Sequence, residues 1–200
     1  ARRSAFAPAG WVGRQILEEF HAAFLAGDTL FVHAGLLPEH LEQGLDGLNA
    51  EFRRQLQASL TSWLGKEGAL LKATGPLWLR RLAKTPEAGV CPQLARVLEL
   101  AGAKRMVIGH TQVDEGAVRP RCGGRLLLAD TIISREGYPE CWQPNSMKAE
   151  GCQGSLSYVE VRDGEAAAVR VPPPGDAEGA APEVEVTPMP ILAGVERGEL

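Results

Sequence analysis

The sequence predicts an α/β fold in which helices and strands alternate before a group of hairpins. Two short apolar runs, at residues 29–32 and 105–108, each follow an amphipathic segment with helical spacing. Each run ends in a loop that contains glycine and histidine, as expected of buried parallel strands whose carboxyl ends lie at one edge of a sheet. Beyond residue 117 the apolar runs are shorter and are separated by glycine, which is typical of hairpins.

The composition is that of one globular unit. The 200 residues are 44% hydrophobic and 23% charged, which is sufficient for a domain with a core. A net charge of -4 and the lack of a long basic run argue against nucleic-acid and membrane surfaces. No apolar run reaches the roughly 18 residues of a transmembrane helix, and residues 1–10 lack the apolar core of a signal peptide.

The chain begins at Ala1-Arg2-Arg3, without an initiator methionine, and we expect it to be a piece of a longer protein. The cytoplasm is the default location. An organelle is the alternative if a targeting signal lies upstream.

Amphipathic segments account for the predicted helices. Apolar positions at three- and four-residue steps occur in residues 12–25, in residues 39–64 with a break near 44–47, and in residues 91–100. Gly27-Asp28 is expected to end the first segment and Ala101-Gly102 the third, in which Pro92 suits the first turn. The leucines of these segments are expected to form the core.

Short strands follow the last helix. They are predicted at residues 117–118, 125–129, 157–161 and 167–171. The last two flank Arg162-Asp163-Gly164, a hairpin signal. A long irregular insert runs from 134 to 154. We therefore expect one domain over residues 1–171, followed by a Pro/Ala/Glu-rich, disordered tail over residues 172–200.

The four cysteines show no C-x-x-C spacing that would predict a zinc or redox motif. We interpret all four, Cys91, Cys122, Cys141 and Cys152, as buried or free thiols in a reducing compartment. The minor alternative is a pair between Cys141 and Cys152, which bracket the insert, under oxidation.

His33 and His110 are the candidate metal ligands. Each follows a predicted buried strand and has glycine close by, so the topology brings two neutral imidazoles to one sheet edge. The alternative for either residue alone is a histidine that bonds a loop carbonyl. His40 is a weaker candidate ligand because it is near His33 in the sequence, and His21 is expected to face solvent.

Two charged residues complete the candidate site. Asp130 follows the strand at residues 125–129, where its carboxylate either orients a ligand histidine or binds loop amides. Arg80 follows Trp78, and its planar guanidinium suits an anionic substrate. The alternative is an arginine on a helix surface.

These motifs occur in the order of a known family. They are the run from Phe31 to His40, the element Trp78-Leu79-Arg80, the motif from Val107 to Gln112, Cys122, and Asp130-Thr131 through Ser134. Over about residues 10–162 the chain resembles the C-terminal half of a Shewanella-like protein phosphatase. That family lies in the phosphoprotein phosphatase branch of the calcineurin-like metallophosphoesterases.

The resemblance implies the C-terminal part of an αββα sandwich, with mixed sheets flanked by helices and metals at the sheet edge. His33 and His110 would be ligands of the second metal of a divalent pair of Mn, Fe, Zn or Mg. Arg80 would be a phosphate-binding residue and Asp130 a loop-positioning residue. The implied chemistry is hydrolysis of a serine or threonine phosphoprotein or phosphopeptide by a metal-activated hydroxide.

The chain also departs from the family pattern. The family motifs Gly-Asp-x-His, Gly-Asp-x-x-Asp-Arg-Gly and Gly-Asn-His-Glu do not occur in it. Two imidazoles cannot hold two hard cations without carboxylates, so this segment supplies one half-site only. Ile132-Ile133 replaces a small glycine-containing step, and because a β-branched residue resists positive φ we expect the loop to take a different path.

Two hypotheses follow. In the first, the chain is a segment of a metal-dependent phosphatase whose other ligands lie upstream. In the second, it is a truncated pseudophosphatase that acts as a binding module.

Overall fold

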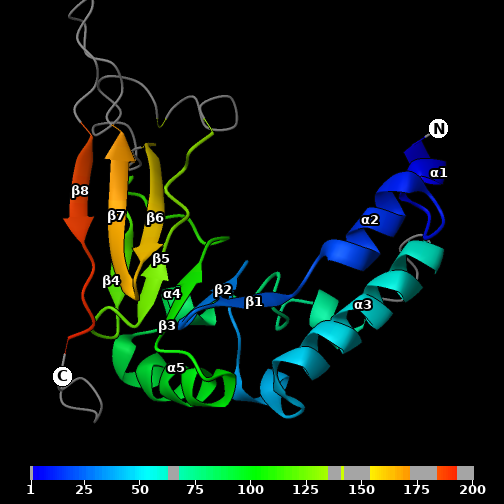
Figure 1. Ribbon diagram of the computed structural model, residues 1–200, viewed down its shortest axis with the longest axis horizontal. Coiled ribbons are helices and arrows are strands. Elements are labelled where there is room, and N and C mark those ends of the chain that lie inside the picture. The colour runs from blue at the N-terminus through cyan, green and yellow to red at the C-terminus, as the bar shows by residue number, and fades with distance from the viewer. Residues whose placement is uncertain (1, 63–67, 135–140, 142–153, 172–183, 193–200) are drawn as a thin grey trace, which may run out of the picture.

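Two stacked β-sheets and a set of helices make up the molecule (Figure 1). The computed structural model describes residues 2–62, 68–134, 141, 154–171 and 184–192. The helices are α1 (Arg2–Phe6), α2 (Trp11–Glu19), α3 (Gly44–Ser62), α4 (Arg81–Lys84) and α5 (Glu87–Ala101), with 3-10 turns η1 (Pro38–Leu41) and η2 (Ala69–Leu71). The strands are β1 (Ala23–Ala26), β2 (Thr29–Val32), β3 (Arg105–Ile108), β4 (Arg119–Arg121), β5 (Leu126–Leu128), β6 (Leu156–Arg162), β7 (Glu165–Val171) and β8 (Glu185–Pro188).

The larger sheet has the strand order β1-β2-β3-β5-β4. Strands β2, β3 and β5 are parallel, and β1 and β4 are antiparallel edge strands. Val32 pairs with Ile108, so β2 and β3 end level with each other. The sequence prediction of an α/β fold with these two strands side by side is confirmed.

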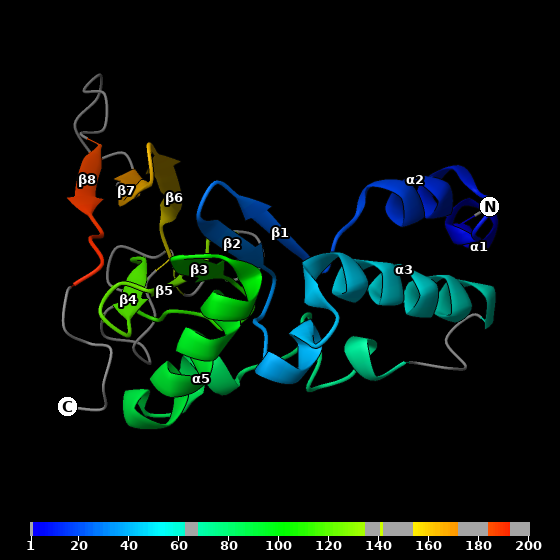
Figure 2. The ribbon, with the colours of Figure 1, turned by 60° about the horizontal axis from the view of Figure 1, so that its bottom comes forward.

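The central strands are buried on both faces, which explains their continuous apolar sequences. On β3, Met106 and Ile108 belong to the core that contains α3 and α5, whereas Val107 belongs to the core shared with the second sheet. Strand β5 repeats this alternation. Figure 2 shows the resulting layers, with α5 on one side of the larger sheet and β6 to β8 on the other.

The second sheet is antiparallel, in the order β6-β7-β8. The hairpin predicted across Arg162-Asp163-Gly164 is present, and Asp163 and Gly164 have φ values of 54° and 81°. Strand β8 pairs with β7 inside the range predicted to be a disordered tail, so that prediction does not hold for residues 185–188. Residues 172–183 and 193–200, like most of the insert at 134–154, lie outside the described residues.

The first predicted helix is wrong in its second half. Helix α2 ends at Glu19, and Ala23–Ala26 forms β1, an antiparallel hairpin with β2. Gly27, at φ 59°, supplies the left-handed residue of the turn that sequence reasoning took as a helix stop. The buried side chain of Asn49 on α3 accepts the N–H of Ala22 and donates to the carbonyl of Ala23, which fixes β1 in its extended form.

Other boundaries differ less. Helix α5 begins at Glu87, directly after Pro86, and not at Cys91. It ends at Ala101 with Gly102 (φ 66°) as its C-cap, so the predicted end at Ala101-Gly102 is confirmed, and the N–H of Ala103 bonds to the carbonyl of Leu98. The strand predicted at residues 117–118 is β4, two residues further on.

The prediction of free thiols at Cys91 and Cys122 is wrong, because these residues form a disulfide with a Cα–Cα distance of 5.4 Å. Neither sequence spacing nor composition signals the pair, which exists because the fold places the first turns of α5 beside the β4–β5 turn. Cys141 is disulfide-bonded as well, and Cys152 lies outside the described residues. In the described part of the chain, every helix is too short or too polar to cross a bilayer.

Candidate functional site

The two candidate histidines lie together at the carboxyl edge of β2 and β3. His33 directly follows β2, and His110 comes two residues after β3. The N–H of Gly109 donates to the carbonyl of His33 at 2.9 Å, which joins the two loops. The ring centroids are 5.0 Å apart, with an angle of 53° between the planes. The topology therefore brings two imidazoles, predicted from separate motifs, into one site.

His110 is held in an unusual state. Its backbone has a φ of 62°, which is uncommon for a residue other than glycine. Burial is the main cause that lowers the pKa of its imidazole, and the charges of Arg80 and His33 lower this pKa further. Its Nε2 atom is buried and has no hydrogen-bond partner among the described residues. A neutral ring with an unpartnered nitrogen is the form in which histidine binds a metal.

Arg80 and Trp78 border the histidine pair. Arg80 precedes α4, and its Nη1 atom donates to the carbonyl of His110 at 3.1 Å and contacts Thr111 Oγ1 at 3.5 Å. The Trp78 ring meets the His110 ring edge to face, with centroids 5.4 Å apart. Both residues are exposed, so a cation and an aromatic surface lie beside the imidazoles. Sequence reasoning did not identify Thr111, a buried polar residue next to the guanidinium.

Asp130 lies in the loop after β5. Its charge raises the pKa of His110, but burial and the charges of Arg80 and His33, which lower this pKa, are stronger. Its carbonyl accepts the N–H of Val113 at 2.8 Å, and its Oδ1 atom accepts the N–H of Ile132 at 3.5 Å. Ile132 has a φ of 58°, so the expectation that it avoids positive φ is wrong. Its burial (3% exposed) and the bond to Asp130 together hold it in this strained conformation.

The other two histidines do not join the pair. His40 accepts the N–H of Leu37 through Nδ1 at 3.1 Å, and its pKa is lowered mainly by burial. These contacts give His40 a structural role in η1, and the weaker hypothesis of a ligand has no support from them. His21 is exposed, and its Nδ1 atom lies 2.9 Å from the carbonyl of Glu19.

The donor set suits one metal better than two. Two imidazoles favour a borderline cation such as zinc, whereas a pair of hard cations needs carboxylates for charge and for a bridge. Among the described residues the histidine pair is not part of a group of three or more His, Cys, Asp or Glu side chains with close ligand atoms. Among the described residues, the two imidazoles therefore lie together without a third such donor close by.

Two curated proteins share sequence with the chain. Shewanella-like protein phosphatase 2 of Arabidopsis thaliana is 31% identical over 152 residues, which cover 70% of this chain and 37% of that protein. An uncharacterized protein of Schizosaccharomyces pombe is 32% identical over 128 residues, covering 61% of this chain and 37% of its own length. No family model matches the sequence.

Solved structures show the same fold. A cold-active protein-tyrosine phosphatase of a psychrophilic Shewanella species superimposes with a TM-score of 0.53 at 18% identity, over 78% of this chain and 42% of that chain. A mutant of a cold-active protein tyrosine phosphatase gives 0.54 at 20% identity over the same shares. The mixed α/β architecture is therefore that of a phosphatase-like fold. The chain spans about two-fifths of the proteins that it matches.

Proposed function

Because this chain belongs with the Shewanella-like protein phosphatases in sequence, we propose that it supplies one half of the metal site of a metal-dependent phosphoesterase, a serine/threonine protein phosphatase. The observation that carries the proposal is the meeting of His33 and His110, with centroids 5.0 Å apart and a buried, unpartnered Nε2 on His110. The remaining ligands of a divalent pair belong to the part of the longer protein that this chain does not cover.

Each residue of the site has a proposed role. His33 and His110 hold one cation through neutral nitrogens, and Asp130 fixes the loop that carries its neighbours. Arg80 binds an oxygen of the phosphoryl group, since its guanidinium lies beside the imidazoles and its remaining N–H groups can reach an anion. When bound, the divalent metals lower the pKa of a water and neutralise charge on the phosphate.

The proposed substrates are phosphoproteins or phosphopeptides. Relatives named as a protein phosphatase and as protein-tyrosine phosphatases support the phosphoryl chemistry. They leave two candidates for the phosphorylated residue of the substrate, serine/threonine and tyrosine. The serine/threonine class is proposed from the sequence relative, at 31% identity, because the tyrosine-named structures are only 18–20% identical. Paired phosphothreonine and phosphotyrosine peptides of one sequence, given to the longer protein, distinguish the two classes. Faster release of phosphate from the tyrosine peptide would overturn this choice.

The metal half-site is tested on the oxidised chain by calorimetric titration with zinc. Loss of binding is expected for His33→Ala and for His110→Ala. The matched control is His21→Ala, because His21 is exposed and its Nδ1 atom contacts the carbonyl of Glu19. Equal zinc affinity in all four proteins would contradict the half-site.

Activity is tested with p-nitrophenyl phosphate and Mn²⁺. The chain alone should give no turnover, and the longer protein should lose at least ~100-fold in rate on His110→Ala. Turnover by the chain alone, abolished in both histidine variants, would show that its site is complete and would contradict the half-site. Binding of phosphopeptide by the chain alone, without turnover, would instead favour the truncated pseudophosphatase.

A further inference from the structure

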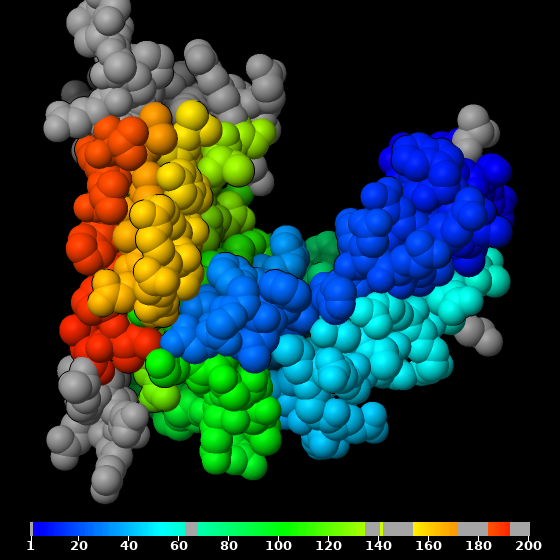
Figure 3. All heavy atoms as spheres, in the orientation of Figure 1, coloured from blue at the N-terminus to red at the C-terminus, as the bar shows by residue number. Residues whose placement is uncertain are grey.

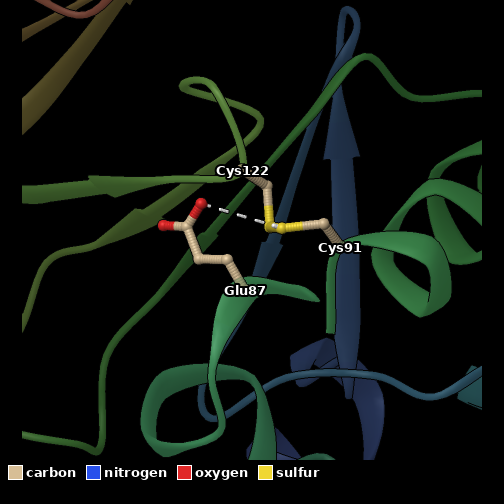
Figure 4. Close-up of side chains that lie close together, drawn as sticks. All are labelled: Glu87, Cys91 and Cys122. Carbon is tan, nitrogen blue, oxygen red and sulfur yellow. Dashed lines mark hydrogen bonds between the residues drawn. A yellow bond between two sulfur atoms is a disulfide. The ribbon is translucent and has the colours of Figure 1, made fainter. Parts of the chain in front are cut away.

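A second group of metal-ligand side chains lies where the start of α5 meets the β4–β5 turn, around the Cys91–Cys122 disulfide (Figure 4). Glu87 and Cys91 are one helical turn apart on α5, and Cys122 lies in the β4–β5 turn. One ligand atom from each of the three lies within 4.8 Å of the other two. The Cys91 sulfur and Glu87 Oε2 are 4.0 Å apart.

We propose that the reduced form of this group, Cys91, Cys122 and Glu87, is a binding site for zinc or a similar thiophilic divalent cation. The proposal is independent of the phosphatase function, because none of these side chains contacts the histidine pair. It requires the disulfide to open first. A dithiol reductant becomes a disulfide and transfers two electrons and two protons to the cysteines, and the cation then displaces both protons as it binds the thiolates.

The geometry of the backbone allows two thiolates to share a cation. Zn–S bonds of ≈ 2.3 Å in a tetrahedral arrangement hold two sulfurs ~3.8 Å apart. A Cα–Cα distance of 5.4 Å is compatible with this spacing once the two side chains rotate apart. The carboxylate of Glu87 already points at the sulfurs, as the helical spacing of Glu87 and Cys91 requires.

The local charges favour an occupied site. Two thiolates and one carboxylate carry three negative charges, which a divalent cation and the neighbouring guanidinium of Arg121 neutralise together. Arg121 Nε lies 3.7 Å from Glu87 Oε1, whereas the Oε2 atom faces the sulfurs. One carboxylate oxygen thus contacts the guanidinium, and the other is available to the proposed metal ion. Arg121 is also held by the carbonyls of Leu82 and Thr85, and it therefore orients the carboxylate without depending on it.

A route to the site is present as well. Cys122 is 1% exposed, but Cys91 and Glu87 are only partly buried. Glu87 and Arg121 line a cavity of about 270 Å³ that also borders Met189 and Leu192. Among the described residues no fourth ligand joins the group, which leaves a coordination position for water or a small anion.

Cobalt(II) is the probe, because thiolate ligation gives it a near-ultraviolet charge-transfer band. The background variant carries Cys141→Ser and Cys152→Ser, so that only two thiols are available, and His33→Ala and His110→Ala, so that the other cation site is removed. After reduction, one equivalent of Co²⁺ should produce the band, and an excess of Zn²⁺ should abolish it. The oxidised protein should give no band.

Three further variants locate the ligands. Cys91→Ser and Cys122→Ser should each remove the thiolate band or halve its intensity, and Glu87→Gln should weaken Co²⁺ binding by at least ~10-fold. The matched control is Glu99→Gln, an exposed carboxylate at the other end of α5. A reduced protein without the band, or a band of unchanged intensity in either cysteine variant, would overturn the proposal. An unchanged Co²⁺ affinity in Glu87→Gln would show that the carboxylate of Glu87 is not a ligand.

Discussion

The histidine edge, formed by the loops after β2 and β3, and the cysteine group at the start of α5 are built in different ways. At the histidine edge, each histidine follows an apolar strand, and adjacent parallel strands bring the two together through pairs such as Val32 and Ile108. At the cysteine group, a helix and a hairpin turn meet across 31 residues of sequence without pairing between strands. Short sequence motifs can therefore predict a site at strand ends, whereas they do not predict a site between a helix and a turn.

The space-filling view shows α5 below the strands, while α1, α2 and α3 extend to the right (Figure 3). Both regions rest on the same apolar core, which includes buried residues of β2, β3, β5 and α5. Experiments that disturb this core should therefore affect both regions, and experiments at one region should leave the other intact.

The largest effect is expected from Leu126→Ala. Leu126 is fully buried on β5 and pairs with Met106 on β3, so its truncation leaves a cavity beneath both regions. The free energy of unfolding should fall by about 3 to 4 kcal/mol, measured by urea denaturation. Val186→Ala on β8, where the side chain is 61% exposed, is the control and should cost less than about 0.5 kcal/mol. A loss below ~1 kcal/mol for Leu126→Ala would mean that the core closes around the gap.

Removal of the disulfide comes next. The double variant Cys91→Ser/Cys122→Ser should lose about 3 kcal/mol of unfolding free energy, because the bond restricts the unfolded chain across a loop of 31 residues. Zinc affinity of the histidine pair in the oxidised wild type and in this variant should agree within ~2-fold if the two regions are separate. A larger change in that affinity would show that the cysteine group supports the histidine edge.

Asn49→Ala is expected to have an intermediate effect on the histidine side only. The side chain of Asn49 is 5% exposed, accepts from Ala22 and donates to Ala23, so truncation leaves buried backbone groups of β1 unpaired. A loss of about 2 kcal/mol should appear in urea denaturation. Gln57→Ala, on the exposed side of the same helix, should be nearly neutral. Equal free energies of unfolding in the two variants would mean that water takes over the hydrogen bonds of the Asn49 amide to Ala22 and Ala23.

The contrast between the regions also explains how far sequence reasoning reached. The α/β class, the order of β2 and β3 and the β6–β7 hairpin were predictable because two-sided burial and turn residues leave local patterns. The meeting of His33 and His110 followed from those strands. Strand β1 was missed because its four residues fit a helical spacing equally well. Tertiary contacts, the pairing with β2 and the bonds to Asn49, decide between the two. The disulfide and the zinc ligands were missed because their proximity arises from packing alone.

The smallest effect concerns His40, which lies in η1 and is not part of the histidine edge. Burial lowers the pKa of the folded imidazole below the ordinary value of 6.5, against smaller opposite effects of Glu39 and of the Thr74 carbonyl. The unfolded chain therefore takes up the proton first. Stability should be constant above about pH 6.5 and should decline as the pH falls through that value toward the lower pKa of the folded state.

His40→Gln should reduce this decline, measured as the unfolding free energy at several pH values between 5 and 7.5. It should not abolish the decline, because burial lowers the pKa of His110 in the same direction. The carboxyls of Asp28, Glu51 and Glu115 do not interfere, since their lowered pKa values, about 2 for Glu51, place their effects at more acidic pH. A slope in His40→Gln equal to that of the wild type would contradict this role of His40 and would assign the whole decline to His110 at the histidine edge.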